Sequence, residues 1–251
     1  MIASSPFGLE NKVVLVTGAS SGIGRAAAVE ISKLGGTVVI SGRNEVELAR
    51  TLDLLSGVGH RVLACDLQDR DEVAEMVDAL PALDGVVNNA GISKFATLGH
   101  LNEEQFQEVL QINTLSPIFL LNRLIKTKRI RKGGSVVFTS SIAALQQATY
   151  AYSMYTTSKA GLQGFVRIAA LELAGKRIRV NSVNPAMIET EMVGKSGWIT
   201  PEQYEADKQR YPLKRYGRPE EVANAIAFLL SDASSWITGT SLVIDGGIGL
   251  R

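Results

Sequence analysis

Short apolar segments alternate with longer amphipathic segments along almost the whole chain. The short segments are rich in Val and Ile and apolar at successive positions, which is typical of parallel strands buried on both faces. In the longer segments, apolar residues recur at helical spacing. The pattern predicts seven strands, at about 12–16, 37–40, 61–65, 84–88, 135–140, 178–183 and 240–244. It predicts six main helices, at about 23–34, 44–55, 69–80, 102–128, 153–174 and 218–231.

Strands and helices alternate without a change of composition, a low-complexity segment or an internal repeat. We therefore expect a single α/β domain over residues 1–251, built on a doubly wound parallel sheet with helices on both faces. The stretch at about 187–215 differs because it is charged, rich in Gly and Pro, and weakly periodic. Such stretches are often binding loops, so we expect a substrate-loop insertion there.

Composition excludes several classes of protein. Hydrophobic residues make up 45% of the 251 residues, and the net charge of +1 gives no overall attraction to nucleic acid. A single cysteine, Cys65, rules out an internal disulfide and suits a reducing compartment. His60 and His100 are too isolated for a histidine-based metal site, so we predict no metal. With no signal peptide and no long apolar run, we expect a cytoplasmic protein that does not enter a membrane.

The first strand leads into a glycine-rich turn with Gly18, Gly22 and Gly24, and a helix follows. Glycines at this place let the backbone approach a pyrophosphate, which the amide groups of the helix start then bind. A plain strand-to-helix turn would also use flexible residues, but the position between the first strand and the first helix favours a nucleotide site. We expect the nucleotide to contact Gly18, Ser20, Ser21, Gly22, Ile23 and Gly24.

The end of the second strand bears on the choice of nucleotide. An NAD site usually places an acidic residue there, but this chain has Ser41, Arg43 and Asn44. An arginine can pair with a 2′-phosphate, so we expect NADP(H). Asp66 and Leu67, after the third strand, are placed to bracket the adenine, although Asp66 could equally be a helix cap.

Tyr155 and Lys159 stand four residues apart in a predicted helix, which puts a phenol and an ammonium group on one face. A nearby positive charge favours the phenolate and lowers the phenol pKa toward the range of an acid–base catalyst. Tyr204 and Lys208 have the same spacing. Their segment carries many charges and is typical of a solvated helix, so we do not expect that pair to be catalytic.

The motifs T-G-A-S-S-G-I-G at 17–24, N-N-A-G at 88–91 and I-D-G-G at 244–247, with Asn113, Ser141, Tyr155 and Lys159, resemble those of the short-chain dehydrogenase/reductase family. The resemblance covers nearly the whole chain and implies a Rossmann-like fold with seven parallel strands. The general pattern and the tail at 215–230 are most similar to 3-oxoacyl-[acyl-carrier-protein] reductases and their relatives.

The resemblance also implies a catalytic set. Asn113 would hold a water that links Lys159 to solvent, and Ser141, rather than the adjacent Ser140, would bind the substrate oxygen. Tyr155 would pass the proton, while Lys159 would lower the phenol pKa and bind the nicotinamide ribose. Further cofactor contacts carried over from the family are Asn89, Ala90, Gly91, Pro185, Ile188 and Thr190. Ala186 departs from the usual glycine and would be strained if its φ were positive.

The function implied is NADP(H)-dependent reduction of a ketone to a secondary alcohol. The substrate is either a 3-oxoacyl thioester on acyl carrier protein or another ketone, such as a sugar, a steroid or a xenobiotic, and a non-catalytic NADP-binding regulator is the remaining alternative. Basic stretches at 126–132 and at Lys176-Arg177 could dock an acidic carrier, or merely complement helix ends. The family also implies a homotetramer packed through the helices at 102–128 and 153–174. Candidate pocket residues are Lys94, Phe95, Gln147, Tyr150, Tyr152, Met187, Met192 and Trp198.

Overall fold

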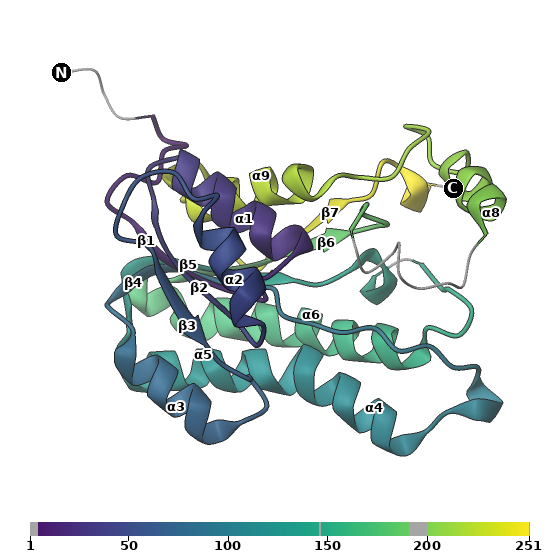
Figure 1. Cartoon of the computed structure of the whole chain (residues 1–251), viewed down its shortest axis with the longest axis horizontal. Helices are drawn as coiled ribbons and strands as arrows, with labels where there is room; N and C mark the ends of the chain where they lie inside the picture. Colours follow the sequence, from purple (N-terminus) through teal and green to yellow (C-terminus); the bar gives the residue numbers. More distant parts are fainter. Residues whose placement is uncertain (1–4, 146, 191–199, 251) are drawn as a thin grey trace.

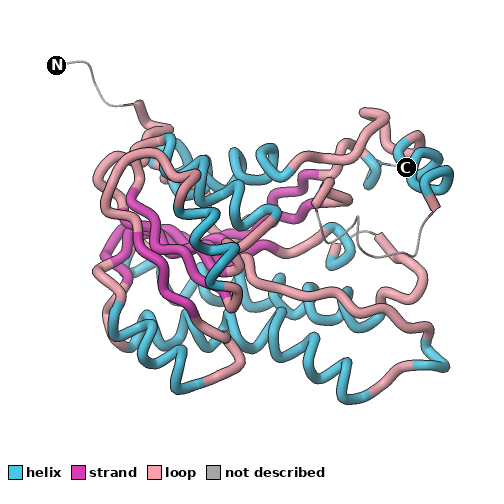
Figure 2. The backbone as a smooth tube through the Cα atoms, viewed as in Figure 1, coloured by secondary structure: helices cyan, strands magenta, loops and turns pink. Residues whose placement is uncertain are grey.

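A computed structural model describes residues 5–145, 147–190 and 200–250. Its strands form one parallel sheet of seven strands in the order β3-β2-β1-β4-β5-β6-β7 (Figure 1, Figure 2). The predicted α/β fold with a seven-stranded parallel sheet is confirmed. The strands are β1 Val13–Thr17, β2 Thr37–Gly42, β3 Arg61–Ala64, β4 Leu83–Asn88, β5 Ile130–Thr139, β6 Arg179–Pro185 and β7 Ser241–Ile244.

Helices cover both faces of the sheet, as the sequence predicts (Figure 1). On one face lie α1 Gly22–Lys33, α2 Glu45–Leu52 and α9 Pro219–Leu230. On the other lie α3 Arg70–Ala79, α4 Glu103–Leu110, α5 Ser116–Lys126 and α6 Ser153–Leu173. A further short helix, α8 Pro201–Lys208, stands apart from the sheet at one end of the molecule (Figure 1). Within the described ranges, no helix is both long and apolar enough to cross a membrane.

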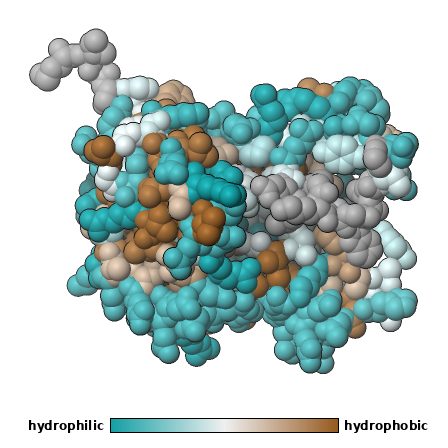
Figure 3. All heavy atoms as spheres, in the orientation of Figure 1, coloured by the Kyte–Doolittle hydropathy of each residue, from teal (hydrophilic) through white to brown (hydrophobic). Residues whose placement is uncertain are grey.

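Successive strand residues point into two different cores. In β5, Val136 and Phe138 pack with α5 and α6, whereas Val137 packs on the side of α1 and α9. Because side chains alternate across a strand, a strand that is buried on both faces must be apolar at every position. This is why the apolar runs of the sequence have no polar alternation. In contrast, α3 and α4 show mainly hydrophilic residues to solvent (Figure 3).

The predicted helix at 102–128 is not one regular α-helix. A π-helical turn, Gln111–Leu115, separates α4 from α5. Such turns widen a helix by one residue and are frequent at functional sites. The turn contains Asn113, whose side chain is bonded to a neighbouring loop and to α6. Amphipathic spacing alone cannot reveal this, because one extra residue hardly alters the apolar pattern.

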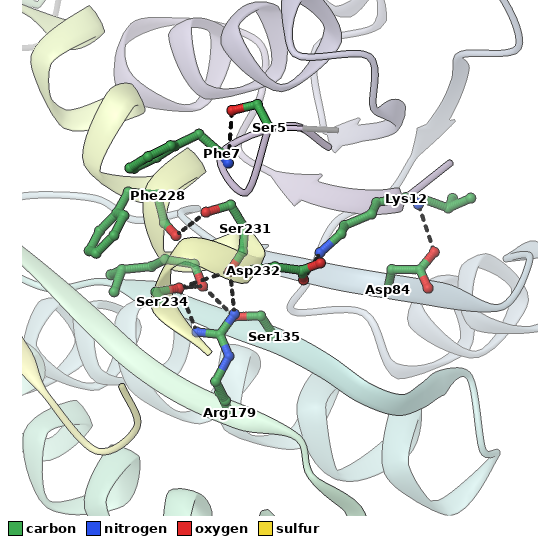
Figure 4. A network of polar contacts seen from close by, with 12 residues as sticks. Ser5, Phe7, Lys12, Asp84, Ser135, Arg179, Phe228, Ser231, Asp232 and Ser234 are labelled. Carbon is green, nitrogen blue, oxygen red and sulfur yellow. Dashed lines mark hydrogen bonds and ion pairs between the residues drawn. The ribbon is translucent and has the colours of Figure 1, made fainter. Parts of the chain in front are cut away.

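A polar network fixes the sheet at the amino-terminal ends of β6 and β1 (Figure 4). Arg179 donates to the Ser234 hydroxyl at 2.8 Å and to the Ser231 carbonyl at 3.1 Å, beyond the end of α9. Lys12, just before β1, pairs with Asp232 at 2.5 Å. Burial lowers the pKa of Arg179, and its hydrogen bonds offset part of the desolvation cost. This edge therefore has a structural role.

Candidate active site

A cavity of about 1720 Å³ opens at the carboxyl ends of the strands. Loops that follow β1, β2, β3, β4, β5 and β6 line it, together with residues of and after α8. In open parallel sheets, ligands bind at this edge. The volume exceeds the roughly 300–1,000 Å³ of a pocket for one drug-sized ligand, so it has room for two ligands side by side.

Most of the predicted site residues line this cavity, although they come from the ends of six strands, the loops after them, and the helices α1 and α6. They are Gly18, Ser20, Ser21, Gly22, Ile23, Ser41, Arg43, Asp66, Leu67, Asn89, Ala90, Gly91, Ser141, Tyr155, Lys159, Pro185, Ile188 and Thr190. Three other predicted residues, Gly24, Asn44 and Asn113, are not part of the lining. Over the described ranges, no three His, Cys, Asp or Glu side chains gather as metal ligands.

The glycine-rich turn is held by close backbone packing. Gly18 has a φ of +63°, and a Cβ there would lie 2.8 Å from the Ala90 Cα. A Cβ at Gly24 would lie 2.1 Å from the Gly18 carbonyl oxygen. Gly24 is therefore required for the turn to close, and it does not face the cavity. The Asn89 side chain supports the same turn by donating to the Thr17 and Gly18 carbonyls, each at 3.3 Å.

The amino-terminal end of α1 faces the cavity. Ser21 precedes the helix but makes no side-chain capping bond, and the first turn contains no acidic residue. Amide groups and the positive end of the helix dipole are thus available to an anionic ligand. Across from this turn lies Thr190, whose Cγ2 would be 3.3 Å from a Cβ at Gly22. The glycine turn and the loop after β6 therefore lie close together.

The residues after β2 have three different roles. Arg43 lines the cavity, and its Nη1 lies 4.0 Å from Asp66 Oδ2. The Ser41 hydroxyl donates to Met76 Sδ at 3.3 Å and thus points into the core. Asn44 caps α2 by accepting from the Glu47 amide at 3.1 Å. Of these three residues, only Arg43 presents a charged side chain at the cavity.

The alternative role of Asp66 as a helix cap is wrong. The cap of α3 is Asp69, whose Oδ1 accepts from the amides of Asp71 and Glu72 at 2.8 and 3.1 Å. Asp66 instead accepts from the Gln68 amide at 3.0 Å, in the turn that lines the cavity. The helix begins three residues later than Asp66 would require, so its carboxylate stays at the cavity wall.

Lys159 and Tyr155 meet at the floor of the cavity. Lys159 is only 4% exposed, its Nζ donates to the Thr139 carbonyl at 2.8 Å, and it lies 5.9 Å from the centroid of the Tyr155 ring. Burial lowers the pKa of Lys159 to about 8. Burial also raises the pKa of Tyr155 to about 12, although a hydrogen bond with Ser141 opposes this shift.

The expectation that Lys159 lowers the pKa of the Tyr155 phenol stays a prediction, because the raised pKa of Tyr155 reflects burial and the nearby Tyr152. Removing both groups from water favours the neutral form of each, and burial is the largest cause of both shifts. Spacing along a helix shows that the two groups are neighbours. It does not show how little water reaches them.

The two adjacent serines after β5 point in different directions. The Ser140 hydroxyl donates to the Lys159 carbonyl at 3.2 Å and is buried in the protein. The Ser141 hydroxyl forms the bond with Tyr155 already described, accepts from the Ala143 amide at 3.2 Å and lies 3.5 Å from the Pro185 carbonyl. This geometry favours Ser141 as the serine that contacts a substrate.

Asn113 supports the site from behind the cavity wall. Its Oδ1 accepts from the Ile92 amide at 2.8 Å, and its Nδ2 donates to the Ile92 carbonyl at 2.9 Å and to Ser158 at 3.0 Å. A Cβ at Gly91 would lie 3.1 Å from Asn113 Oδ1 and 3.3 Å from Lys159 Nζ, so glycine lets the two side chains approach. A water link from Asn113 to Lys159 stays a prediction.

Ala186 is not strained. The described non-glycine residues with positive φ are Asn11, Lys128, Ala151, Arg177 and Lys214. The Ala186 amide donates to the Ile244 carbonyl at 3.0 Å, which fixes the start of the loop after β6. Alanine can therefore replace the usual glycine without backbone strain.

The substrate end of the cavity includes residues that sequence analysis missed. Lys94, Phe95, Gln147, Tyr150, Tyr152 and Met187 line the cavity as candidates, whereas Met192 and Trp198 lie outside the described residues. Asp207, Arg210 and Tyr211 also line it, although nothing in the sequence singled them out. Asp207 lies three residues after Tyr204, and Tyr211 lies three residues after Lys208. This helical spacing was the signal that could have placed them on the same side as that pair.

Tyr204 and Lys208 are not on a fully solvated helix. Lys208 Nζ lies 4.5 Å from the Tyr204 ring centroid and 5.7 Å from that of Tyr216, and it pairs with Glu189 at 3.3 Å. The prediction of a solvated face is wrong on this side of α8, because the helix packs on Tyr216, which is 1% exposed. Neither residue of the pair lines the cavity.

A family model described as enoyl-(acyl carrier protein) reductase matches residues 18–249. The 3-oxoacyl-[acyl-carrier-protein] reductases of Thermotoga maritima and Rickettsia felis are 39% and 38% identical to this chain, over 96% of it and 98% of each relative. The chain belongs to the short-chain dehydrogenase/reductase family.

Other members of the short-chain dehydrogenase/reductase family are named for different substrates. An L-xylulose reductase of Caenorhabditis elegans is 34% identical over 94% of this chain and 95% of its own. The solved aldohexose dehydrogenase of Thermoplasma acidophilum superposes with a TM-score of 0.85 at 31% identity, covering 97% of this chain and 96% of its own. The family consists of oxidoreductases that use a nicotinamide dinucleotide, which confirms the prediction of an oxidoreductase. The range of substrate names leaves the substrate open.

Proposed function

We propose that this protein reduces a ketone to a secondary alcohol with NADPH. The observation that carries the proposal is the meeting of Tyr155 and Ser141 at the cavity floor, with Lys159 behind them. Two hydroxyl groups that converge on one point can hold a carbonyl oxygen and deliver a proton to it. An enoyl double bond offers no such oxygen at the carbon that accepts hydride.

The residues around the cavity fit a dinucleotide. The glycine turn and the open end of α1 suit a pyrophosphate, while Arg43 suits a 2′-phosphate. Lys159 would bind the nicotinamide ribose, and Ile188 and Thr190 would contact the carboxamide. When bound, NADP(H) supplies or accepts the hydride.

The proton is handled by the side chains of this chain. With a pKa of about 12, Tyr155 is protonated at neutral pH and enters reduction as a proton donor. Ser141 holds the substrate oxygen beside that phenol. Lys159, with a pKa of about 8, is still mainly charged at pH 7 and stabilises the phenolate once the proton has left. Lys159 thus acts on Tyr155 by stabilising the phenolate that the proton transfer produces.

The substrate is a 3-oxoacyl thioester on acyl carrier protein, or another ketone such as a sugar, a steroid or a xenobiotic. The names of the acyl-carrier reductases among the relatives support the first. The position of the basic stretch at 126–132 limits how a carrier protein docked there could reach the cavity. This stretch runs into the start of β5, where Ile130 pairs with Leu83, and Ser141 follows the other end. The 6 residues of β4 alongside, Leu83–Asn88, span about 20 Å. A carrier docked there would be a whole sheet length from the cavity of the same subunit.

We also propose a homotetramer packed through α5 and α6. Phe119, Ile168 and Leu171 are 61%, 55% and 74% exposed on these helices, and large apolar side chains are costly to leave in water. A twofold axis across these helices would run them antiparallel. The basic stretch of one subunit would then lie toward the cavity of its partner, so carrier docking requires the oligomer.

Oxidation of NADPH with a ketone panel tests the proposed function. The panel contains an acetoacetyl thioester, a sugar ketone, a steroid ketone and simple diketones, with a crotonyl thioester for enoyl reduction and NADH beside NADPH. We expect NADPH-dependent turnover of at least one ketone and none of the crotonyl thioester. Tight NADPH binding without turnover of any ketone would favour a non-catalytic regulator. A preference for NADH would refute the role of Arg43.

A further inference from the structure

We propose, on the basis of the ketone reduction proposed above, that the substrate half of the cavity selects ketones whose carbonyl carbon carries a flat apolar ring. The surface that would recognise this ring is made of Phe95, Tyr152 and Tyr155, which we call the aromatic row. All three residues line the cavity.

The aromatic row is continuous up to the proton donor. The ring centroids of Phe95 and Tyr152 lie 4.5 Å apart with the planes tilted by 33°. Those of Tyr152 and Tyr155 lie 6.0 Å apart and nearly perpendicular, at 86°. A carbonyl oxygen bonded to the Tyr155 hydroxyl therefore has its carbon substituent next to Tyr152. A flat ring at that position can add to the row as one more stacked or edge-on partner.

The backbone holds the row in place before any ligand arrives. The Ala96 amide donates to the Ala151 carbonyl at 3.0 Å, which joins the loop of Phe95 to that of Tyr152. The Tyr152 amide donates to the Thr149 carbonyl at 3.2 Å, closing the turn. Ala151 has a φ of +65°, a left-handed conformation that is strained for a non-glycine residue. Backbone strain of this kind is often found where function needs a fixed side-chain position.

Charges at this end of the cavity are already paired. Lys94 forms an ion pair with Glu108, and Arg210 lies 2.9 Å from Asp207. Any phosphate or carboxylate on the substrate would have to compete with these carboxylates for the cations. An uncharged ring next to the carbonyl does not need to displace these carboxylates from the cations.

The tyrosines of the chain are concentrated at this site. Aromatic residues are only 6% of the sequence, yet four of its six tyrosines, Tyr150, Tyr152, Tyr155 and Tyr211, line the cavity. Catalysis accounts for one of them. Tyrosine gives a broad, rigid apolar face at a low cost in conformational entropy, and such faces suit flat apolar ligands.

Three ketones of nine carbons test the proposal: propiophenone, ethyl cyclohexyl ketone and ethyl hexyl ketone. They share an ethyl group and a carbonyl and differ only in whether the other substituent is flat, puckered or linear. We would measure kcat/KM with NADPH for the wild type and for Tyr152→Leu and Phe95→Leu. We expect each substitution to lower kcat/KM about tenfold for propiophenone and less than about twofold for ethyl hexyl ketone. Comparing each variant with the wild type cancels the intrinsic reactivities of the ketones.

Phe7→Leu is the matched control, because the Phe7 ring pairs with the Phe228 ring (Figure 4), with centroids 6.2 Å apart, and neither residue lines the cavity. It should change none of the three values. Equal losses for all three ketones, or a shifted pH profile with Tyr152→Leu, would overturn the proposal and make Tyr152 a positioning residue for Tyr155. Retained activity of both variants on propiophenone would overturn it as well. If no ketone of this set or of the earlier panel is reduced although NADPH binds, the proposed function itself fails.

Discussion

Lys159 donates a hydrogen bond from its ammonium nitrogen to the Thr139 carbonyl oxygen, at 2.8 Å. Thr139 ends β5, and Lys159 lies on α6, so the bond joins the sheet to the helix that carries Tyr155. The ammonium is thereby fixed beneath the cavity, away from most water. This contact explains the position of the charge, whereas burial lowers the pKa of the lysine.

Tyr155→Phe should abolish ketone reduction and leave NADPH binding intact. Phenylalanine keeps the ring and its packing on Tyr152 but has no proton to give. Losing a general acid typically costs about 10²–10⁴ in rate. Steady-state turnover and fluorescence titration with NADPH provide the two measurements. Turnover at a near wild-type rate would remove Tyr155 from the mechanism.

Lys159→Met should stabilise the fold at pH 7. Between pH 8 and about 10.4 the unfolded lysine binds a proton that the folded lysine has released, so wild-type stability rises with pH in this window. Below pH 8 the full cost of burying the charge, about 3 kcal/mol, is present, and methionine avoids it at the loss of one hydrogen bond.

Thermal unfolding of wild type and Lys159→Met at pH 7 and pH 9.5 measures this effect. The variant should have the higher Tm at pH 7, and the difference should shrink at pH 9.5. The comparison cancels other titrating groups, such as Tyr155, that both proteins share. A Tm difference that does not change with pH would show that Lys159 is charged in the folded protein over the whole range.

Thr139→Val should stabilise the free protein by about 1 kcal/mol. The Thr139 hydroxyl is buried at the cavity wall without a hydrogen-bond partner among the described residues, and valine has the same shape without that unmet demand. For a chain of this length, about 1 kcal/mol corresponds to roughly 2–4 °C in Tm. Thr139→Ser keeps the hydroxyl and serves as the control.

The same Thr139 variants show whether the hydroxyl contacts a ligand. If it bonds to NADPH, the rise in Tm on adding NADPH should be smaller for Thr139→Val than for Thr139→Ser. A lower Tm of free Thr139→Val than of the wild type would mean that the hydroxyl is satisfied in solution.

Gly24→Ala should disrupt the glycine turn. The added Cβ would lie 2.1 Å from the Gly18 carbonyl oxygen and 2.5 Å from Asn89 Nδ2, so the turn must move. We expect a loss of at least about 1–3 kcal/mol in stability and a marked loss of NADPH affinity. Differential scanning fluorimetry with an NADPH titration measures both.

Gly99→Ala is the control for that experiment, because a Cβ at Gly99 would meet nothing within 4 Å. Its stability and its NADPH affinity should match those of the wild type. Wild-type NADPH binding by Gly24→Ala would contradict the close packing of the turn.

Much of the fold could be predicted from the sequence alone. Continuous apolar runs, helical spacing and a glycine turn are local features, because each follows from the period of a strand or helix or from the backbone freedom of glycine. The same holds for the pairing of Tyr155 with Lys159, which needs only one helical turn. These features also carry the family resemblance that the comparisons confirm.

The tertiary structure decided what depends on contacts between elements. Packing of α8 on Tyr216 brought Asp207 and Arg210 to the cavity, and burial rather than spacing set the pKa values of Tyr155 and Lys159. The length of β5 separated the basic stretch at 126–132 from the cavity of its own subunit. None of these follows from local sequence, because desolvation and distance depend on which faces pack together once the chain has folded.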